Sequence, residues 1–201
     1  MSRFLRPLSL LCLSLIATHG MAAEPEHFRL RLDELKSGRF TRAHLASSDI
    51  DPACKGHNQS PAISWVNAPA GARSFVLVFT DKGVPKGSDG SRWAVVNIPG
   101  SVTQLPGHVG ADGSRLPEGA LQTRTGAGKP GYMGVCPSAK RPTPYEFRVW
   151  ALKTERLDGV TAETPAADVA RLAEAQSLGV ARLTIIDHQG VGYRTGTKLE
   201  R

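Results

Sequence analysis

The segment from Leu116 to Pro137 most constrains the fold, because glycine and proline recur in it too densely for a helix or a central strand. Apolar runs typical of strands flank the segment, so we predict a long, ordered loop between two strands. Tyr132, Met133 and Cys136 favour burial. Glycines allow several backbone N–H groups to approach a small anion closely. The loop is therefore a candidate anion-binding segment.

Hydrophobic patterns elsewhere predict a mainly β domain. The run from Ser74 to Thr80 is almost entirely apolar, which is typical of a strand covered on both faces. The run from Tyr145 to Leu152 alternates, which predicts one buried face and one more polar face. Glycine and proline clusters separate the runs. The predicted strands are Phe28–Leu32, Ser74–Thr80, Trp93–Ile98, Tyr145–Leu152 and Ala181–Ile186.

One amphipathic helix is predicted late in the chain. Thr164 can cap its N-terminus, Pro165 suits its first position, and Asp168 places a negative charge in its first turn. Apolar residues then recur at helical spacing, and Gly179 is expected to end the helix. Packing on the core is the simplest explanation of the apolar stripe. We expect one or two C-terminal helices beside the strands.

The start of the chain has the pattern of a secretory signal. Two arginines precede an apolar run from Leu8 to Ala17 that is too short to span a bilayer, and small residues follow it. We predict a signal peptide over residues 1–22, with cleavage near Ala22 or Ala23. A buried N-terminal helix is the alternative. After removal of the signal peptide, residues 23–201 are expected to form a single domain in the periplasm or outside the cell, without a transmembrane segment.

The charge of the chain is modestly positive. It carries 25 basic and 18 acidic residues, and loss of the two arginines in the signal would leave 23 basic residues and a net charge of +5. The basic residues are scattered, and no aromatic stacking array or nucleic-acid-binding motif accompanies them. Solubility explains the charge most simply, although it also favours encounter with anionic partners. We expect no nucleic-acid partner.

The cysteines predict a disulfide. Cys12 lies in the predicted signal, which leaves Cys54 and Cys136 as a pair in the exported protein. An even pair in an oxidising compartment favours a bond between the two, and two separate buried thiols are the alternative. The bond would close a loop of about 80 residues and attach the glycine-rich loop to the segment around Cys54.

No pattern in the sequence predicts an enzyme. The histidines after the signal lack metal-ligand spacing, and the sequence has no Cys-x-x-Cys motif and no Gly-x-Ser-x-Gly motif. Gly126–Lys129 lacks the full spacing of a phosphate-binding loop. Asp49 and Asp51 lie in a turn-like stretch, and His57 is more simply a loop residue than a catalytic one. We therefore predict no catalytic residues, no metal and no cofactor.

Four sequence blocks resemble, in the same order, motifs of the phosphatidylethanolamine-binding protein family. The first reads Cys54-Lys-Gly-His-Asn-Gln-Ser-Pro-Ala-Ile-Ser-Trp65, which is similar to Cys-Asp-Gly-x-Asn-x-Ser-Pro-x-Leu-x-Trp. The others are Phe75–Pro85, Arg92–Pro99 and the loop Leu116–Pro137, and the resemblance covers roughly residues 28–190. It is to the bacterial branch, relatives of the Raf kinase inhibitor protein. It implies an antiparallel β-sandwich with the helices at its C-terminal end.

The resemblance also implies a pocket for phosphate-like groups, although this chain departs from the pattern. In the family, two aspartates, two histidines, a tyrosine and loop amides form the pocket. Asp81 occupies the first aspartate position, whereas Gly83 occupies the second, and Arg92 and Thr143 occupy the histidine positions. The implied ligand-binding residues are Asp81, Pro85, Arg92, Gly131, Tyr132, Gly134, Pro137, Thr143 and Tyr145.

Arg92 is compatible with two structures of the pocket. Arginine stays charged where histidine titrates, so Arg92 could hold an anion with a bidentate fork. It could equally pair with Asp81 and fill the pocket. The first structure favours a noncatalytic binding module for a small anionic or phosphorylated ligand or a phospholipid headgroup. The second favours a protein-interaction module, resembling a kinase or protease inhibitor, with a vestigial pocket and a protein partner.

Overall fold

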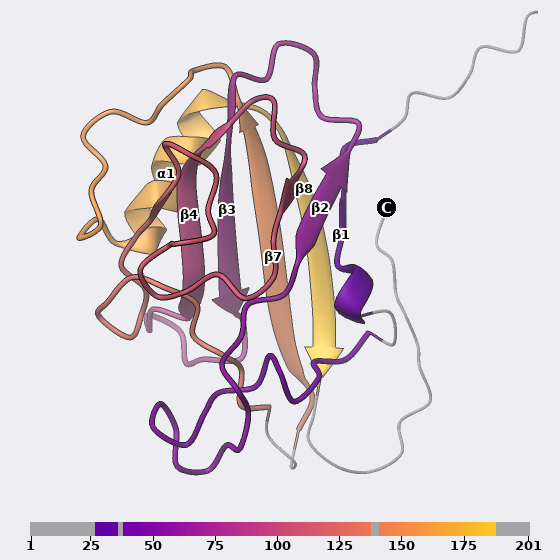
Figure 1. The fold of residues 1–201 in the computed structure, drawn as a ribbon, viewed down its shortest axis with the longest axis vertical. Helices are drawn as coiled ribbons and strands as arrows, with labels where there is room; N and C mark the ends of the chain where they lie inside the picture. The colour runs from indigo at the N-terminus through magenta and orange to yellow at the C-terminus, as the bar shows by residue number, and fades with distance from the viewer. Residues whose placement is uncertain (1–26, 36–37, 138–140, 188–201) are drawn as a thin grey trace, which may run out of the picture.

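A computed structural model describes residues 27–35, 38–137 and 141–187 of the chain (Figure 1). The predicted signal peptide and its cleavage site lie outside these residues. Within them the chain forms two antiparallel β-sheets and a single α-helix. This architecture confirms the predicted mainly β class, and the helix comes late in the chain, as expected. No helix in the described part is long and apolar enough to cross a membrane.

The larger sheet has five strands and forms the centre of the molecule. Residues Ser74–Thr80 were predicted as a doubly covered strand because they are apolar, and β3 is buried along nearly its whole length. It lies between its two antiparallel neighbours, β4 and β7. In order across the sheet, the strands are β6 (Leu121–Gln122), β4 (Ser91–Pro99), β3 (Ser74–Asp81), β7 (Thr143–Leu152) and β8 (Ser177–Asp187).

The smaller sheet covers one face of the larger one. It has the order β1 (Arg29–Arg31), β2 (Ile63–Val66) and β5 (Gln104–Leu105), and a short 3₁₀ helix, η1 (Asp33–Leu35), follows β1. Both sheets contribute to one apolar core, in which Trp65 packs against Phe75 with ring centroids 5.0 Å apart. Figure 1 shows β1 and β2 beside β8. The expected antiparallel sandwich is thus present.

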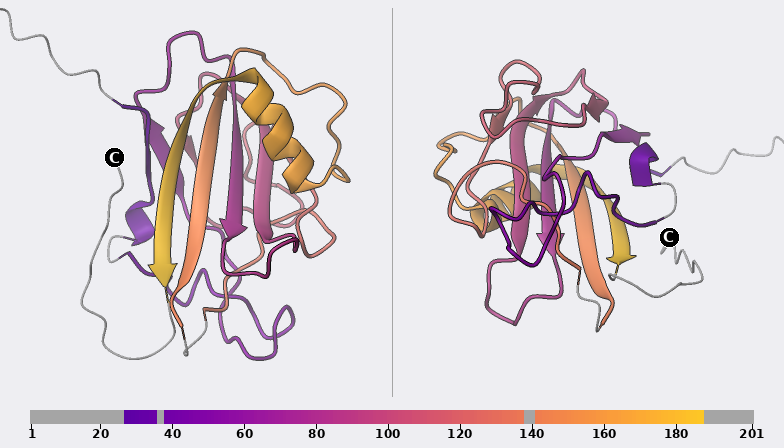
Figure 2. Two further views of the ribbon diagram at one scale, coloured as in Figure 1. Left: turned by 180° about the vertical axis from the view of Figure 1, so that it is seen from behind. Right: turned by 60° about the horizontal axis from the view of Figure 1, so that its bottom comes forward.

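Helix α1 (Ala166–Gln176) covers the opposite face of the five-stranded sheet, as Figure 2 shows from behind. Val169 and Ala173 are fully buried there, in a second core that includes Trp150 of β7. The indole N–H of Trp150 donates to the Glu174 carboxylate over 2.7 Å, which fixes the helix on the sheet. The apolar stripe of the helix is therefore explained by packing on the core.

Both predicted ends of the helix need correction. Pro165 is the N-cap rather than the first helical residue, and no side chain caps the helix, since the Thr164 hydroxyl accepts a hydrogen bond from the Thr161 N–H instead. The helix ends at Gln176, and Gly179 lies inside β8. Pairing of β8 with β7 begins at Ser177, so strand pairing determines the end of the helix.

Candidate functional site

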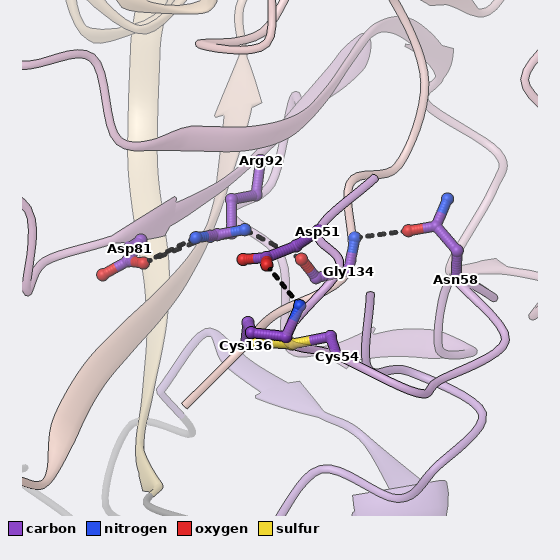
Figure 3. Close-up of a disulfide and its surroundings, with 8 residues drawn as sticks. Asp51, Cys54, Asn58, Asp81, Arg92, Gly134 and Cys136 are labelled. Carbon is purple, nitrogen blue, oxygen red and sulfur yellow. Dashed lines mark hydrogen bonds and ion pairs between the residues drawn. A yellow bond between two sulfur atoms is a disulfide. The ribbon is translucent and has the colours of Figure 1, made fainter. Parts of the chain in front are cut away.

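Arg92 and Asp81 form an ion pair where strands β3 and β4 meet the glycine-rich loop (Figure 3). Asp81 ends β3, and Arg92 is the second residue of the neighbouring β4. Arg92 donates to Asp81 Oδ2 from Nε over 3.2 Å and from Nη2 over 2.8 Å. Its Nη1 donates to the Gly134 carbonyl over 2.8 Å. The structure therefore contains the Arg92–Asp81 pair, which was one of the two expected alternatives.

Asp81 is engaged on both of its oxygens. Its Oδ1 accepts the Gly83 N–H over 2.8 Å, while Oδ2 accepts from the guanidinium group. The side chain of Asp81 is 9% exposed and that of Arg92 is 17% exposed. A partly buried pair of this kind is favourable only when further hydrogen bonds support both groups, and here the Gly83 N–H and the Gly134 carbonyl provide them. The site is close to electrically neutral and holds the guanidinium in one orientation.

Two departures from the family pattern fit one another in space. A Cβ atom at Gly83 would lie 2.6 Å from Cγ2 of Thr143 and 3.2 Å from Oδ1 of Asp81. Thr143 is buried, and its methyl group occupies the space that a side chain at position 83 would need. An aspartate at 83 is therefore incompatible with Thr143 in this conformation. The second aspartate and the second histidine of the family are replaced together.

Neither Tyr145 nor Pro85 has a hydrogen bond to Arg92 in the described part of the chain. Tyr145 is opposite Asp81 in the β3–β7 pairing and is 1% exposed. Burial is the main cause that raises the pKa of its hydroxyl, and the Asp81 charge raises it further. Pro85 is exposed in the turn after β3. Tyr145 therefore acts as a wall of the core beside the ion pair.

The resemblance places Tyr132 in the ligand pocket, whereas the structure buries it. Its ring stacks on Phe79 at 5.9 Å and meets Trp93 edge-on at 5.7 Å. Its hydroxyl donates to the His44 carbonyl over 2.9 Å, and burial strongly raises its pKa. Because that hydroxyl already has a protein partner, Tyr132 anchors the loop and does not offer its O–H to a ligand in this structure.

The backbone N–H groups of the glycine-rich loop are also engaged. Those of Met133, Gly134 and Val135 donate to the Arg92 carbonyl, the Asn58 Oδ1 and the His44 carbonyl. The loop therefore does not present these three N–H groups as the anion-binding concavity that its glycines suggested. Gly131 has a φ of 109° and is buried, and Pro137 is buried as well. The glycines allow close packing, because a Cβ at Gly134 would lie 2.5 Å from the Ala46 nitrogen.

Asn58 holds this loop in place, and the sequence did not indicate its role. Its Nδ2 donates to the Tyr132 carbonyl over 3.1 Å, and its Oδ1 accepts the Gly134 N–H over 2.6 Å. Asn58 has a left-handed backbone conformation with a φ of 54°, which asparagine tolerates better than most residues. It lies in the first motif block, where the asparagine position was the one available signal.

The predicted disulfide between Cys54 and Cys136 is present (Figure 3). It joins two segments 82 residues apart, with Cα atoms separated by 5.9 Å. Cys136 is two residues after Gly134, so the bond fixes the loop next to the Arg92 site. Asp51 lies near the two sulfur atoms, and its carboxylate accepts the Ala53 N–H as expected for a turn residue. Disulfide sulfurs are not available as thiolate ligands, so this group does not form a metal site.

A buried histidine forms a second polar cluster that the sequence did not single out. His44 is 2% exposed, and its Nε2 and Nδ1 lie 3.0 Å from Glu34 Oε2 and from Thr41 Oγ1. Burial lowers the pKa of His44, although the Glu34 carboxylate acts in the opposite direction. The cluster connects η1 with the segment around His44, whose carbonyl accepts the hydrogen bond from the Tyr132 hydroxyl. Its role is to position that segment.

The fold and the sequence agree with one protein class. Residues 40–186 match the phosphatidylethanolamine-binding protein family, and the chain belongs to that family. At the position of the pocket that the resemblance implied, Arg92 is paired with Asp81.

Within this family the chain is similar to bacterial proteins. It is 36% identical to the UPF0098 protein YbcL of Escherichia coli over 179 residues, which are 88% of this chain and 96% of YbcL. The crystal structure of YbcL, described as a new member of the mammalian PEBP family, superposes with a TM-score of 0.74 at 37% identity and covers 81% of this chain and 99% of that one.

Two further relatives match shorter stretches. Escherichia coli YbhB, another UPF0098 protein, is 43% identical over 103 residues, which are 51% of this chain and 65% of YbhB. The putative lipoprotein LppC of Mycobacterium tuberculosis is 32% identical over 129 residues, which are 62% of this chain and 60% of LppC.

Proposed function

We propose that this protein is an exported, noncatalytic binding module that holds a small anionic or phosphorylated group, free or as a lipid headgroup, at Arg92. The observation that carries the proposal is a guanidinium fixed at the family's anion site by Asp81 and Gly134. A group held in one orientation loses little entropy when a ligand binds to it. Arginine is also the side chain best suited to phosphate geometry.

Arg92 keeps hydrogen-bonding capacity in this position. A guanidinium has five N–H bonds, of which three are engaged here, and the side chain is 17% exposed. Exposed cations adjoin the turn beside it, because Lys82 follows Asp81 and Arg141 Nη2 lies 3.4 Å from the Gly83 carbonyl. These cations favour the approach of an anion. The Asp81 carboxylate opposes the approach, so we expect weak binding.

Calorimetric titration with sulfate and with phosphoethanolamine tests the proposal. We expect saturable binding that Arg92→Ala weakens by about tenfold or more, since a charged hydrogen bond contributes roughly 1.5–3 kcal/mol. Arg73→Ala is a matched control, because Arg73 is paired with Glu155 at the other end of β3. Equal affinity in the wild type and in Arg92→Ala would show that the site is assigned wrongly.

Vesicle flotation separates the possible sources of the anionic group. A free ligand and a lipid headgroup share the same phosphate chemistry, so solution affinity alone does not distinguish them. We compare vesicles of phosphatidylethanolamine in phosphatidylcholine with vesicles of phosphatidylcholine alone. Selective flotation that Arg92→Ala abolishes indicates a headgroup ligand. Solution binding without flotation indicates a free anion.

A protein-interaction or inhibitor module is the second candidate, and the engaged state of the site favours it. Both Asp81 oxygens and the N–H groups of residues 133–135 already have protein partners. On this second proposal the filled pocket would be a structural support, and the loops would contact a protein partner. Absence of sulfate and phosphoethanolamine binding in both the wild type and Asp81→Asn would favour it over the first candidate.

Export is part of the proposal and rests on the basic and apolar start of the chain. The name of the relative LppC, a putative lipoprotein, is compatible with a location outside the cytoplasm. Expression of the full chain in a bacterial host, followed by intact-mass measurement of the periplasmic fraction, tests it. We expect loss of about 22 residues and two fewer hydrogens than the reduced mass, because of the disulfide. A full-length cytoplasmic product would contradict export.

A further inference from the structure

A cavity of about 230 Å³ lies beside the glycine-rich loop, and neither Asp81 nor Arg92 lines it. Its walls come from residues 58–59 and 108–111, and Tyr132 contributes to the lining. Binding sites of small molecules are concave and combine apolar surface with a few placed polar groups. This cavity has such a composition, because Val109 and Ala111 lie beside Asn58, Gln59 and His108.

The two walls of the cavity each carry a non-glycine residue with left-handed backbone conformation. Asn58 has a φ of 54° and His108 a φ of 58°. The surrounding chain holds His108 in place, since its N–H donates to the Ser60 carbonyl over 2.8 Å and the next N–H, of Val109, donates to Ser60 Oγ over 2.9 Å. Conformations of this kind persist only where neighbouring structure enforces them, and they cluster at ligand sites.

The side chains of Gln59 and His108 are available to a ligand. Neither has a side-chain hydrogen bond to the described part of the chain, whereas the Asn58 amide is engaged with Tyr132 and Gly134. The carbonyl groups of Gly110 and Ala111 accept from the Gln122 side chain. Among the lining side chains, the Gln59 carboxamide and the His108 imidazole are therefore the ones whose hydrogen-bonding groups remain wholly available.

The charge of the lining limits the ligand to neutral molecules. Among the described residues, no lysine, arginine, aspartate or glutamate lines the cavity. A charged ligand would therefore meet no fixed opposite charge among these lining side chains. The Gln59 carboxamide offers a donor and an acceptor side by side, and this pair is complementary to a second amide group. Ala111 is exposed at the cavity and provides the apolar contact that an acetyl methyl group needs, whereas Val109 is largely buried in the core.

We propose that this cavity is a second binding site, specific for a small neutral ligand that carries an amide, of the size of an N-acetylated amino sugar. Gln59 pairs with the amide of the ligand, and His108 bonds to a hydroxyl group beside it. The site is separate from the anion site at Arg92. It adjoins that site through Asn58, whose side chain bonds to Gly134.

Titration of the ¹⁵N-labelled protein with N-acetylglucosamine tests this proposal by NMR. We expect shifts confined to the cavity, at the amides of Gly110 and Ala111 and at the Gln59 side chain, with a dissociation constant of roughly 1 mM. Glucose has the same ring but no amide, so it should bind about tenfold more weakly. Gln59→Leu should weaken N-acetylglucosamine binding by about tenfold through the loss of the paired hydrogen bonds.

Two variants serve as controls. Gln104→Leu makes the same change at an exposed glutamine of β5 and should leave binding unaltered. Arg92→Ala should also retain the cavity shifts, which separates this proposal from the anion site. Absence of saturable shifts at the cavity would overturn the proposal, as would equal binding by the wild type and Gln59→Leu. Loss of the shifts in Arg92→Ala would show that the two sites are not separate.

Discussion

At the scale of single residues, Arg92 distinguishes this site from a histidine-lined pocket. Arginine stays protonated throughout the neutral pH range, and threonine at the other histidine position does not ionise. We therefore predict that sulfate affinity changes less than tenfold between about pH 6 and pH 8. Sulfate is used because the second ionisation of a phosphate near pH 6 would add its own dependence.

Calorimetry at several pH values measures this dependence, with Arg92→His as the comparison. The histidine variant should bind sulfate more weakly as the pH rises, because its imidazole loses its charge. If the affinity of the wild type itself fell tenfold across the same range, another titrating group would control the site. His57 and His108 would then be the first residues to test.

Asp81 gives a second prediction at this scale, because it stabilises Arg92 and also opposes an incoming anion. Asp81→Asn should increase sulfate affinity by up to about tenfold, since it removes the repulsion. The same change should lower the free energy of unfolding by about 1–3 kcal/mol, because it leaves a largely buried guanidinium without its charge partner. Partial exposure of Arg92 keeps the loss below that of a fully buried pair.

Glu155→Gln is the matched control for Asp81→Asn, because it breaks the exposed Arg73–Glu155 pair. Its cost in denaturant unfolding should be at most about 1 kcal/mol. A loss of stability in Asp81→Asn no greater than this, together with unchanged sulfate affinity, would contradict the role given to the Arg92–Asp81 pair.

Part of the site could be predicted residue by residue, and part could not. The motif blocks predicted that Asp81 and Arg92 lie in the same pocket, and an ion pair between them was one of the two alternatives. Asn58 and His44 were not predicted as supports of the loop, because their partners Gly134 and Tyr132 are 76 and 88 residues away. A single sequence does not indicate which distant groups will form hydrogen bonds with one another.

At the scale of elements, the long strands and the short strand β1 were predicted, whereas β2, β5 and β6 were missed. Apolar or alternating runs are long enough in β3, β4 and β7 to give a clear period. Strands β5 and β6 have two residues each, which is too short for any period. Strand β8 is longer than its apolar part, because its pairing with β7 continues to Ser177. That pairing overrode the helix-ending preference of Gly179.

The contact between Glu34 of η1 and His44 in the following segment predicts that stability depends on pH. Burial lowers the pKa of His44 in the folded protein below its unfolded value near 6.5. The unfolded chain therefore binds more protons than the folded one just below that pH. The contribution of His44 to the free energy of unfolding is therefore fully present above about pH 6.5, and it decreases as the pH falls toward the pKa of the folded protein.

Denaturant unfolding at several pH values measures this contribution as the difference between the wild type and His44→Gln. The glutamine retains hydrogen-bonding groups but does not titrate. We expect the variant to lose less stability than the wild type as the pH falls below about 6.5. His57→Gln, at an exposed loop position, should keep the pH dependence of the wild type. Identical curves for the wild type and His44→Gln would mean that His44 is not held neutral by the fold.

At the scale of the whole molecule, the sandwich followed from the resemblance more than from periodicity. Alternation alone indicated antiparallel strands, but it did not specify which strands share a sheet. The order β6-β4-β3-β7-β8 places the two sequence-distant halves of the site, in β3–β4 and in the loop before β7, at one end of the sheet. The chain shares its fold with the YbcL structure.

The disulfide acts on this whole-molecule arrangement, because it connects the first motif block to the loop that contacts Arg92. It restricts the unfolded chain by closing a loop of 82 residues. A loop of this length contributes roughly 3–5 kcal/mol in the chain-entropy account. We therefore predict that Cys54→Ser together with Cys136→Ser lowers the free energy of unfolding by about that amount.

Denaturant unfolding of the purified protein measures this loss, and thiol titration of the unreduced, denatured protein, without the predicted signal peptide, should find no free cysteine. The effect should extend to function, because release of Cys136 frees the Gly134 carbonyl, which orients the guanidinium of Arg92. Sulfate affinity should therefore fall in the double serine variant even under conditions where it remains folded. Two free thiols per chain would contradict the bond in the exported protein. Full stability with unchanged sulfate affinity would show that hydrogen bonds from Asn58 are sufficient to hold the loop.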